Sequence, residues 1–309
     1  MAVLSMGMAS SQDYPNRPVR LIVPLAVGGG MDTIARGVAP KLSETLGKAI
    51  IVDNRPGAGG SVGAEITAHA VPDGYTIMMA SASLVTNVLL YPARYDPGKD
   101  FAAISQVSAQ PYVLISIPSI PATTAKELIA YAKANPGRLN YASSGNGGLI
   151  HLTTELFQSM TGTRLVHIPF GGMGAAYPDI LSGRIQVAFP STISAMPHIK
   201  SGRLRALAVT SRVRIKTLPD VPPLGEAGVP GFDVTQWYGL LAPAATPRVI
   251  IERLHRETVT VLKLPDVVGR MASDGSDPIG STSAHFTAHV RSEIQKWTKV
   301  VKDAGIRGE

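Results

Sequence analysis

Three glycine-rich segments could bind an anion without any charged side chain. They occupy residues 26–31, 143–148 and 170–174, and each follows a short apolar run and precedes a helical pattern. The N-terminus of a helix offers unpaired N–H groups and partial positive charge, and glycine lets the backbone approach a ligand closely. Three such loops brought together would make a carboxylate site from backbone donors, although any one of them could be an ordinary tight turn.

Two polar side chains follow the first two of these loops within three residues. Asp32 comes after the first loop, where its ordinary role is to cap the helix and interact with its dipole. Because its charge would repel an anion, we expect Asp32 to order the loop or to meet an amine of the ligand if it lines the site. His151 stands near the start of the next helix. We expect it to orient the second loop as a hydrogen-bond donor or to contact the ligand.

Cofactor and metal chemistry fit the sequence poorly. Gly28 and Gly30 begin a dinucleotide-type pattern, but Thr33 stands where the next glycine is required. His151 and Glu155 have a metal-ligand spacing without a further helical ligand to complete it. The chain has no cysteine, which excludes a thiol nucleophile, disulfides and cysteine-based metal sites. We therefore expect no cofactor and no metal.

A serine hydrolase is the enzymatic alternative. Residues 59–63 match the pattern G-x-S-x-G around Ser61, but that motif requires a strand running straight into the turn, and residues 54–58 intervene. Ester turnover that is lost in Ser61→Ala would favour the alternative. We expect the protein not to be an enzyme.

Composition narrows the class of protein. A length of 309 residues suits two domains, and the net charge of +7 is scattered rather than gathered in runs, which favours small anions over nucleic acid. The apolar run 102–120 contains polar residues and two prolines, so it is not a membrane span. Residues 1–11 are apolar and small but lack a basic start, and we interpret residues 1–13 as the remnant of a secretory signal or of an appended segment.

The loops require a scaffold of alternating strands and helices. Helical patterns cover 32–46, 63–70, 124–135, 149–160 and 246–262, among others. Apolar strand patterns cover 19–24, 49–52, 75–80, 112–117, 139–142, 164–168, 185–189, 205–210 and 237–241. This alternation predicts parallel sheets covered by helices, in two α/β domains with a cleft between them. Extended segments at 111–118 and 237–243 would cross between the domains, which we place at 14–111 plus 243–309 and at 112–242.

Several motifs together resemble a known family. They include NRPGAGG at 54–60, PDGYT at 72–76, NYASSG at 140–145 and GRLRALAVT at 202–210, within a match that runs from 14 to 309. The chain resembles the Bug family of periplasmic solute-binding proteins, the TctC-like receptors of tripartite tricarboxylate transporters. The resemblance implies a type II periplasmic-binding fold, an α/β fold of two domains with a ligand cleft and two interdomain crossovers.

The resemblance also implies a role. A periplasmic, monomeric receptor would capture a small carboxylate and pass it to the membrane permease subunits of such a transporter, with no nucleic-acid partner. A receptor that presents its ligand to a membrane sensor would need the same ligand-bound surface, so this alternative stays open.

We expect the ligand to lie between the three loops. No lysine or arginine occurs in them, so N–H groups, Ser143 and Ser144 would have to hold it. Apolar side chains of the first and third loops would face its body, which favours an aromatic or medium-chain dicarboxylic acid over citrate. The predicted ligand-binding residues are Leu25, Ala26, Val27, Gly28, Gly29, Met31, Asp32, Ser83, Ser143, Ser144, Gly145, His151, Phe170, Gly171, Gly172 and Met173.

Overall fold

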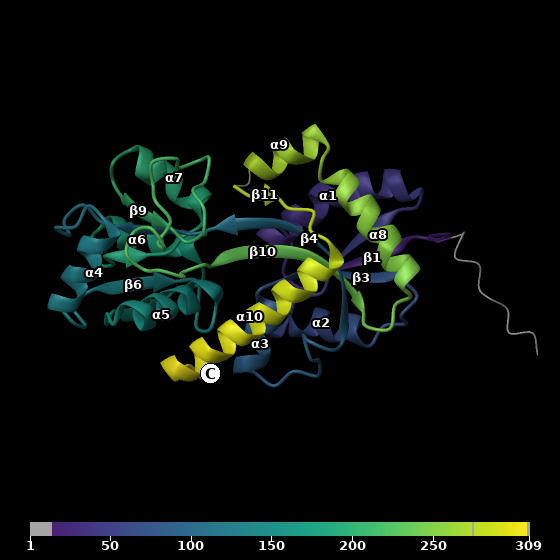
Figure 1. The fold of residues 1–309 in the computed structure, drawn as a ribbon, viewed down its shortest axis with the longest axis horizontal. Coiled ribbons are helices and arrows are strands. Elements are labelled where there is room, and N and C mark those ends of the chain that lie inside the picture. The colour runs from purple at the N-terminus through teal and green to yellow at the C-terminus, as the bar shows by residue number, and fades with distance from the viewer. Residues whose placement is uncertain (1–13, 274, 308–309) are drawn as a thin grey trace, which may run out of the picture.

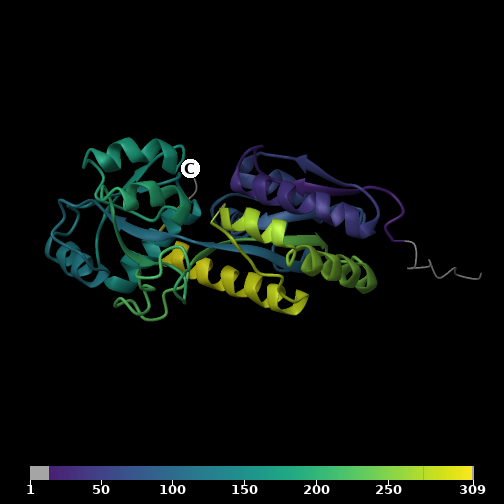
Figure 2. The same ribbon diagram turned by 90° about the horizontal axis from the view of Figure 1, so that it is seen from above.

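The computed structural model describes residues 14–307 apart from residue 274, and the expectations for residues 1–13 lie outside the described residues. Figures 1 and 2 show two lobes joined by long strands. The sheet of the first lobe contains β1 (Val19–Val23), β2 (Ile50–Asn54), β3 (Thr76–Ser81), β4 (Phe101–Pro111), β10 (Thr235–Pro243) and β11 (Asp277–Pro278). The sheet of the second lobe contains β5 (Val113–Ser116), β6 (Asn140–Ser143), β7 (Val166–Pro169), β8 (Val187–Ala188) and β9 (Arg205–Val209).

Helices connect the strands in both lobes. The first lobe carries α1 (Gly30–Leu46), α2 (Ser61–Ala68), α3 (Ser83–Leu90), α8 (Arg248–Val261), α9 (Pro265–Ser273) and α10 (Ser283–Ala304). The second lobe carries α4 (Ala125–Ala134), α5 (Leu149–Thr161), α6 (Met173–Leu181) and α7 (Thr192–Lys200). Within the described ranges, no helix has both the length and the apolar character needed to cross a membrane.

The two faces of the first sheet are covered by different helices because side chains alternate along a strand. Leu21 and Val23 of β1 pack in one core with Met31 of α1, whereas Ile22 between them packs in another core with Ala64 of α2. The predicted two-lobe α/β architecture is therefore confirmed, with helices on both faces of this sheet.

The prediction that the sheets are parallel is wrong for part of each sheet. The strand orders are β11-β4-β10-β3-β1-β2 and β7-β6-β8-β5-β9. The pairs β1–β2, β1–β3, β6–β7 and β6–β8 are parallel, but β10 is antiparallel to β3 and β4, and β5 is antiparallel to β8 and β9. The reason is the crossing itself, since β4 leads out of the first lobe and β10 returns beside it.

The crossover strands β4 and β10 run between the lobes and form the base of the space that separates them. β4 and β10 pair along their length, with Gln236 opposite Gln110, and β5 begins two residues after β4 ends. The predicted boundaries 111/112 and 242/243 fall between β4 and β5 and at the end of β10. How the chain divides into units that move independently stays a prediction.

Helix α10 packs against the crossover strand β4 and against both α3 of the first lobe and α5 of the second. Trp237 of β10 and Trp297 of α10 both donate their indole N–H to Glu293 Oε2, at 3.1 and 2.8 Å. Phe286 covers Gly239 so closely that a Cβ at that glycine would lie 2.1 Å from the ring. The C-terminal helix thus braces the strands that link the lobes (Figure 1).

Candidate functional site

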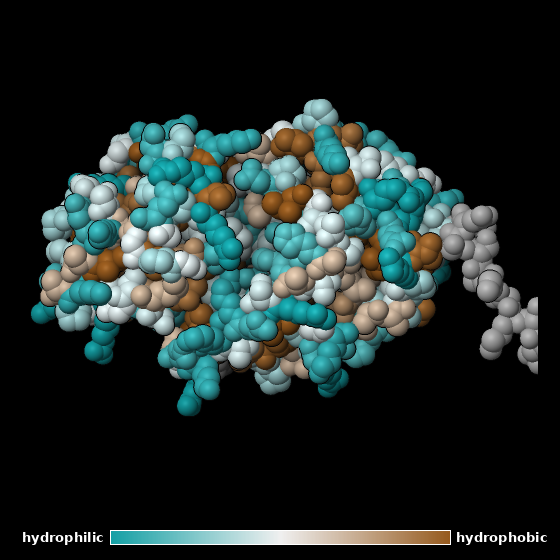
Figure 3. Space-filling view, in the orientation of Figure 1, coloured by the Kyte–Doolittle hydropathy of each residue, from teal (hydrophilic) through white to brown (hydrophobic). Residues whose placement is uncertain are grey.

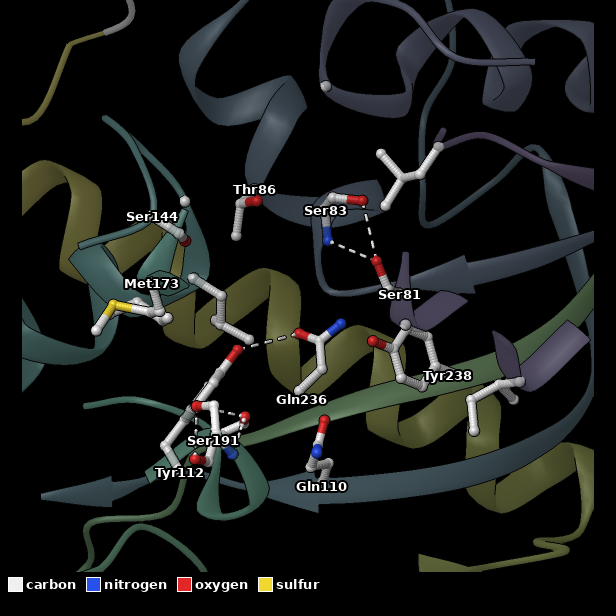
Figure 4. Close-up of a pocket in the computed structure, with 18 of the residues that line it drawn as sticks. Ser81, Ser83, Thr86, Gln110, Tyr112, Ser144, Met173, Ser191, Gln236 and Tyr238 are labelled. Carbon is white, nitrogen blue, oxygen red and sulfur yellow. Dashed lines mark hydrogen bonds between the residues drawn. The ribbon is translucent and has the colours of Figure 1, made fainter. Parts of the chain in front are cut away.

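A cavity of about 950 Å³ lies between the two lobes. Figure 3 shows the surface hollowed there, and Figure 4 shows side chains from both lobes and from the crossover strands converging on it. Among the described residues that line it, none is Asp, Glu, Lys, Arg or His. The lining therefore offers a ligand dipoles and hydrogen bonds but no formal charge.

Helix N-termini surround this cavity. The first residues of four helices line it, namely Gly30 of α1, Ser83 of α3, Leu149 of α5 and Met173 of α6, and so does Ser191, the N-cap of α7. Each helix start carries unpaired N–H groups and a partial positive charge. Together they make an environment suited to an anion although no basic side chain is present.

Hydroxyl groups add donors from each lobe. In the first lobe, Ser81 and Ser83 lie with their Oγ atoms 3.0 Å apart, and Thr86 follows on the next turn of α3. In the second lobe, Ser144 and Ser191 face them across the cavity (Figure 4). A hydroxyl rotates to suit its partner, so these groups can donate to carboxylate oxygens from two sides.

The crossover strands contribute a polar floor that the sequence did not lead us to expect. Gln110, Tyr112, Gln236 and Tyr238 line the cavity, and the Tyr112 hydroxyl donates to Gln236 Oε1 at 3.5 Å. Burial raises the pKa of both tyrosines, so their hydroxyls stay protonated. The available signal was the spacing i, i+2 at 110/112 and at 236/238, around the start of each predicted extended segment, since such residues share one face of a strand.

The structure places four of the predicted ligand-binding residues at the cavity: Leu25, Ser83, Ser144 and Met173. The others lie outside its lining: Ala26, Val27, Gly28, Gly29, Met31, Asp32, Ser143, Gly145, His151, Phe170, Gly171 and Gly172. Met31 packs in the core of the first lobe instead, while Val27 is 69% exposed at the tip of its loop. Contact of any of these residues with a ligand stays a prediction.

Asp32 orders the first loop, as one of its expected roles requires. Its buried carboxylate accepts hydrogen bonds from the Gly28 N–H at 2.9 Å, from Asn54 Nδ2 at 3.0 Å and from Arg36 Nε at 2.9 Å. Asn54 Nδ2 also donates to the Leu25 carbonyl, at 3.1 Å. Burial alone would raise the pKa of Asp32, but these hydrogen bonds and the charge of Arg36 lower it on balance.

His151 orients the second loop as an acceptor, which corrects the expected donor role. The Gly147 N–H lies 3.0 Å from His151 Nδ1, and a backbone N–H can only donate. Nδ1 must therefore hold its lone pair, which leaves the proton of the neutral ring on Nε2. Burial, with a contribution from His167, lowers the pKa of His151 to about 4.

The structure also locates the residues on which two other sequence alternatives rested. Ser61 begins α2 after a short 3₁₀ turn, is 3% exposed and does not line the cavity, so its hydroxyl is not presented as a nucleophile. Across 14–307 without residue 274, no group of three His, Cys, Asp or Glu side chains could hold a metal ion.

The fold has two α/β lobes, joined by paired crossover strands, with a cavity between them. This arrangement is that of solute-binding receptors that hold their ligand between two lobes. The family can also be stated, because residues 34–306 match the model of the tripartite tricarboxylate transporter family receptor. The chain belongs to that family, and the predicted resemblance is confirmed. Proteins of this family are receptors and not enzymes.

Similar proteins agree with this assignment. The chain is 36% identical over 301 residues to BugT of Bordetella pertussis, covering 96% of this chain and 92% of that protein. Rpa4515 of R. palustris with adipate superposes with a TM-score of 0.80 at 34% identity, over 96% of this chain and all of that one. MatC of Rhodopseudomonas palustris with bound malate gives 0.75 at 31% identity, over 93% and 100%. A TctC solute-binding protein from Polaromonas without ligand gives 0.85 at 27% identity, over 94% and 99%.

Proposed function

We propose that this protein captures a small carboxylate in the interlobe cavity, in the periplasm, and delivers it to the membrane permease of a tripartite tricarboxylate transporter. The observation that carries the proposal is the cavity lining, in which helix N-termini and hydroxyls of both lobes converge and no described residue is charged. The permease partner and the monomeric state stay predictions.

The electrostatics of the lining favour an anion. Each helix N-terminus stabilises a nearby negative charge by about 0.3–1 kcal/mol at exposed sites and more when water is excluded. A cation would meet several partial positive charges without a carboxylate to balance them. A carboxylate also has four acceptor positions, which matches the supply of N–H and O–H donors.

The size of the cavity supports an open receptor. At about 950 Å³ it lies near the upper end for small-molecule sites, and it exceeds what a dicarboxylate of about ten heavy atoms fills. The chain also superposes better on the ligand-free relative than on those with adipate or malate. We infer that the lobes close on the ligand and thereby bring further parts of the loops, such as Val27 and Gly28, towards it.

The ligand would have an apolar body. Leu25 and Ile34 of the first lobe and Leu149, Ile150 and Met173 of the second line the cavity. This wall differs from the predicted one, since Phe170 and Val27 are not part of it, but its apolar character is similar. A hydroxyl or third carboxylate left unpaired against it would cost about 1–3 kcal/mol. We therefore favour an aliphatic or aromatic dicarboxylic acid.

Calorimetry with adipate, terephthalate, malate and citrate tests the proposal. We expect adipate or terephthalate to bind more tightly than citrate. A thermal-shift screen of carboxylates extends the test, because a ligand at 100 times its Kd stabilises the folded state by about 2.7 kcal/mol. Binding of citrate alone would refute the apolar wall, and binding of cationic or neutral solutes without any acid would refute the carboxylate receptor.

A further inference from the structure

Three aromatic rings stack beside the glycine loop of the second lobe. The ring of His151 in α5 lies 3.9 Å from that of His167 in β7, measured between centroids, with 18° between the planes. His167 lies 4.8 Å from Tyr141 in β6, with 16° between the planes. Tyr141 and His167 are also direct partners in the β6–β7 pairing. The column therefore connects a helix with two strands.

Two rings of this column contact the loop 143–148 through polar atoms. His151 Nδ1 accepts the Gly147 N–H at 3.0 Å. His167 Nε2 lies 2.6 Å from Ser143 Oγ, and this oxygen accepts the Gly145 N–H at 3.2 Å. One backbone amide of this short loop is thus held by the column directly, and a second is held by Ser143, which contacts the column.

The loop needs such support because its own conformation is unfavourable to most residues. Gly145 and Gly147 have φ of +127° and +69°, values that favour glycine. Gly147 also lies against the opposite lobe, since a Cβ there would be 2.2 Å from Leu90 Cδ1. A shift of this segment would therefore displace both the cavity lining at Ser144 and a contact between the lobes.

The stacked imidazoles act in their neutral form. A protonated His151 could not accept the Gly147 N–H, and two positive rings at this separation would repel each other. The titratable groups that face His151 are His167 from β7, Tyr141 from β6 and Glu155 from α5, whose Oε1 lies 3.9 Å from His151 Nε2. Glu155 is engaged by the Tyr141 hydroxyl, which donates to it at 2.6 Å.

We propose that the stacked pair His151 and His167 is a positioning device for ligand binding, in which the lone pair at residue 151 holds the Gly147 amide and so aims Ser144 and the N-terminus of α5 at the ligand. Neither ring lines the cavity, so both act through the loop. The inference rests on the proposed function for its consequence, which is ligand affinity. It differs from a packing role because it assigns the effect to an acceptor atom rather than to the ring.

Two substitutions at one position separate the acceptor from the ring. His151→Asn keeps an acceptor near Nδ1 and removes the ring, whereas His151→Phe keeps a ring and removes the acceptor. His69→Asn, at an exposed histidine of the first lobe, is the matched control. Amide hydrogen exchange of residues 144–148 reports the loop without any ligand, calorimetry with adipate reports binding, and thermal midpoints verify folding.

We expect His151→Phe to raise exchange at Gly147 about tenfold and to weaken adipate binding about fivefold to tenfold, as loss of one hydrogen bond predicts. His151→Asn should stay within about twofold of the wild type in both measurements, and His69→Asn should be unchanged. The inference would be overturned if His151→Phe kept both properties, or if His151→Asn lost them and His151→Phe did not. Faster exchange in His151→Phe with unchanged affinity would also overturn it.

If the proposed function is wrong, the experiments give a different result from the one expected if only the inference is wrong. A wild type that protects the loop but binds no carboxylate of the screen would contradict the carboxylate receptor. In that case hydrogen exchange alone decides the inference, and equal exchange in the wild type and His151→Phe would overturn it.

Discussion

The glycine loops after β1 and β6 are each held by a side chain at the third position of the following helix, but the two side chains differ in chemical type. Asp32 is the third residue of α1 and accepts the N–H of Gly28, four residues earlier. His151 is the third residue of α5 and accepts the N–H of Gly147, also four residues earlier. Both glycines have positive φ, +82° and +69°. One anchor is a carboxylate and the other a neutral imidazole.

The difference shows how each lobe keeps net charge out of the cavity. The negative Asp32 is balanced behind the first loop by Arg36, whose side chain is 47% exposed, so its charge is paired away from the ligand. At His151 the neighbouring ring is another histidine, and burial disfavours a charge there. In both lobes an anion meets N–H dipoles with no uncompensated charge close behind them.

Removal of the Asp32 carboxylate should lower the stability of the protein more than any other change considered. Asp32→Ala leaves the Gly28 N–H, the Asn54 amide and Arg36 without this acceptor, and we expect the free energy of unfolding to fall by about 2–3 kcal/mol. Denaturation by urea measures it. Asp266→Ala is the control, because its carboxylate is 63% exposed and pairs only at 3.7 Å with Lys41, and it should cost less than about 0.5 kcal/mol. Equal losses in the two variants would contradict the anchoring role of Asp32.

As the pH falls, the stability contributed by His151 should be lost before the stability contributed by Asp32. The pKa of His151 falls from its ordinary 6.5 to about 4 on folding, so between these values only the unfolded chain binds that proton, and stability falls as pH falls. At pH 5 this amounts to about 2 kcal/mol, from 1.5 pH units at 1.36 kcal/mol each. The lowered pKa of Asp32 gives stability that is present above its ordinary value of 3.8 and lost only below it.

Denaturation at pH 7.5 and pH 5 measures this order of events. His151→Phe lacks the titrating group, so it should lose about 2 kcal/mol less than the wild type between the two pH values. Identical losses in both proteins would show that His151 does not titrate as described.

The smallest effects concern single donors, one in each lobe. Ser83→Ala and Ser144→Ala should each weaken adipate binding about tenfold, because each removes one hydrogen bond to a charged carboxylate, worth about 1.5 kcal/mol. Thr260→Ala, at an exposed threonine of α8, should leave affinity unchanged. Calorimetry compares them. A loss in only one of the two serine variants would mean that one lobe alone holds the ligand.

Local patterns predicted the elements and the loops well. The helical pattern over 32–46 gave a helix that the structure places at Gly30–Leu46, and Gly47 ends it in a left-handed cap. The helical pattern over 124–135 likewise gave α4 at Ala125–Ala134, which begins with a capping box of Thr124 and Glu127. Such features depend on neighbours within a few residues, which the sequence displays directly.

Long-range pairing explains what was missed. Tyr112 and Gln236 meet on the cavity floor although 124 residues separate them, and only the antiparallel β4–β10 pairing brings them together. Similarly, the loop sequences predicted donors near a ligand, but the backbone of each loop decides which side chains face inward. Met31 therefore turned into the core, while Ser144 and Leu25 reached the cavity.

The most direct measurement is a crystal structure of the protein with the dicarboxylate that binds most tightly in calorimetry. We predict carboxylate oxygens within about 3.2 Å of backbone N–H groups at helix N-termini and of hydroxyls from both lobes, with no lysine or arginine side chain in contact. A carboxylate held by a pair of arginines, or a ligand bound outside the interlobe cavity, would contradict it.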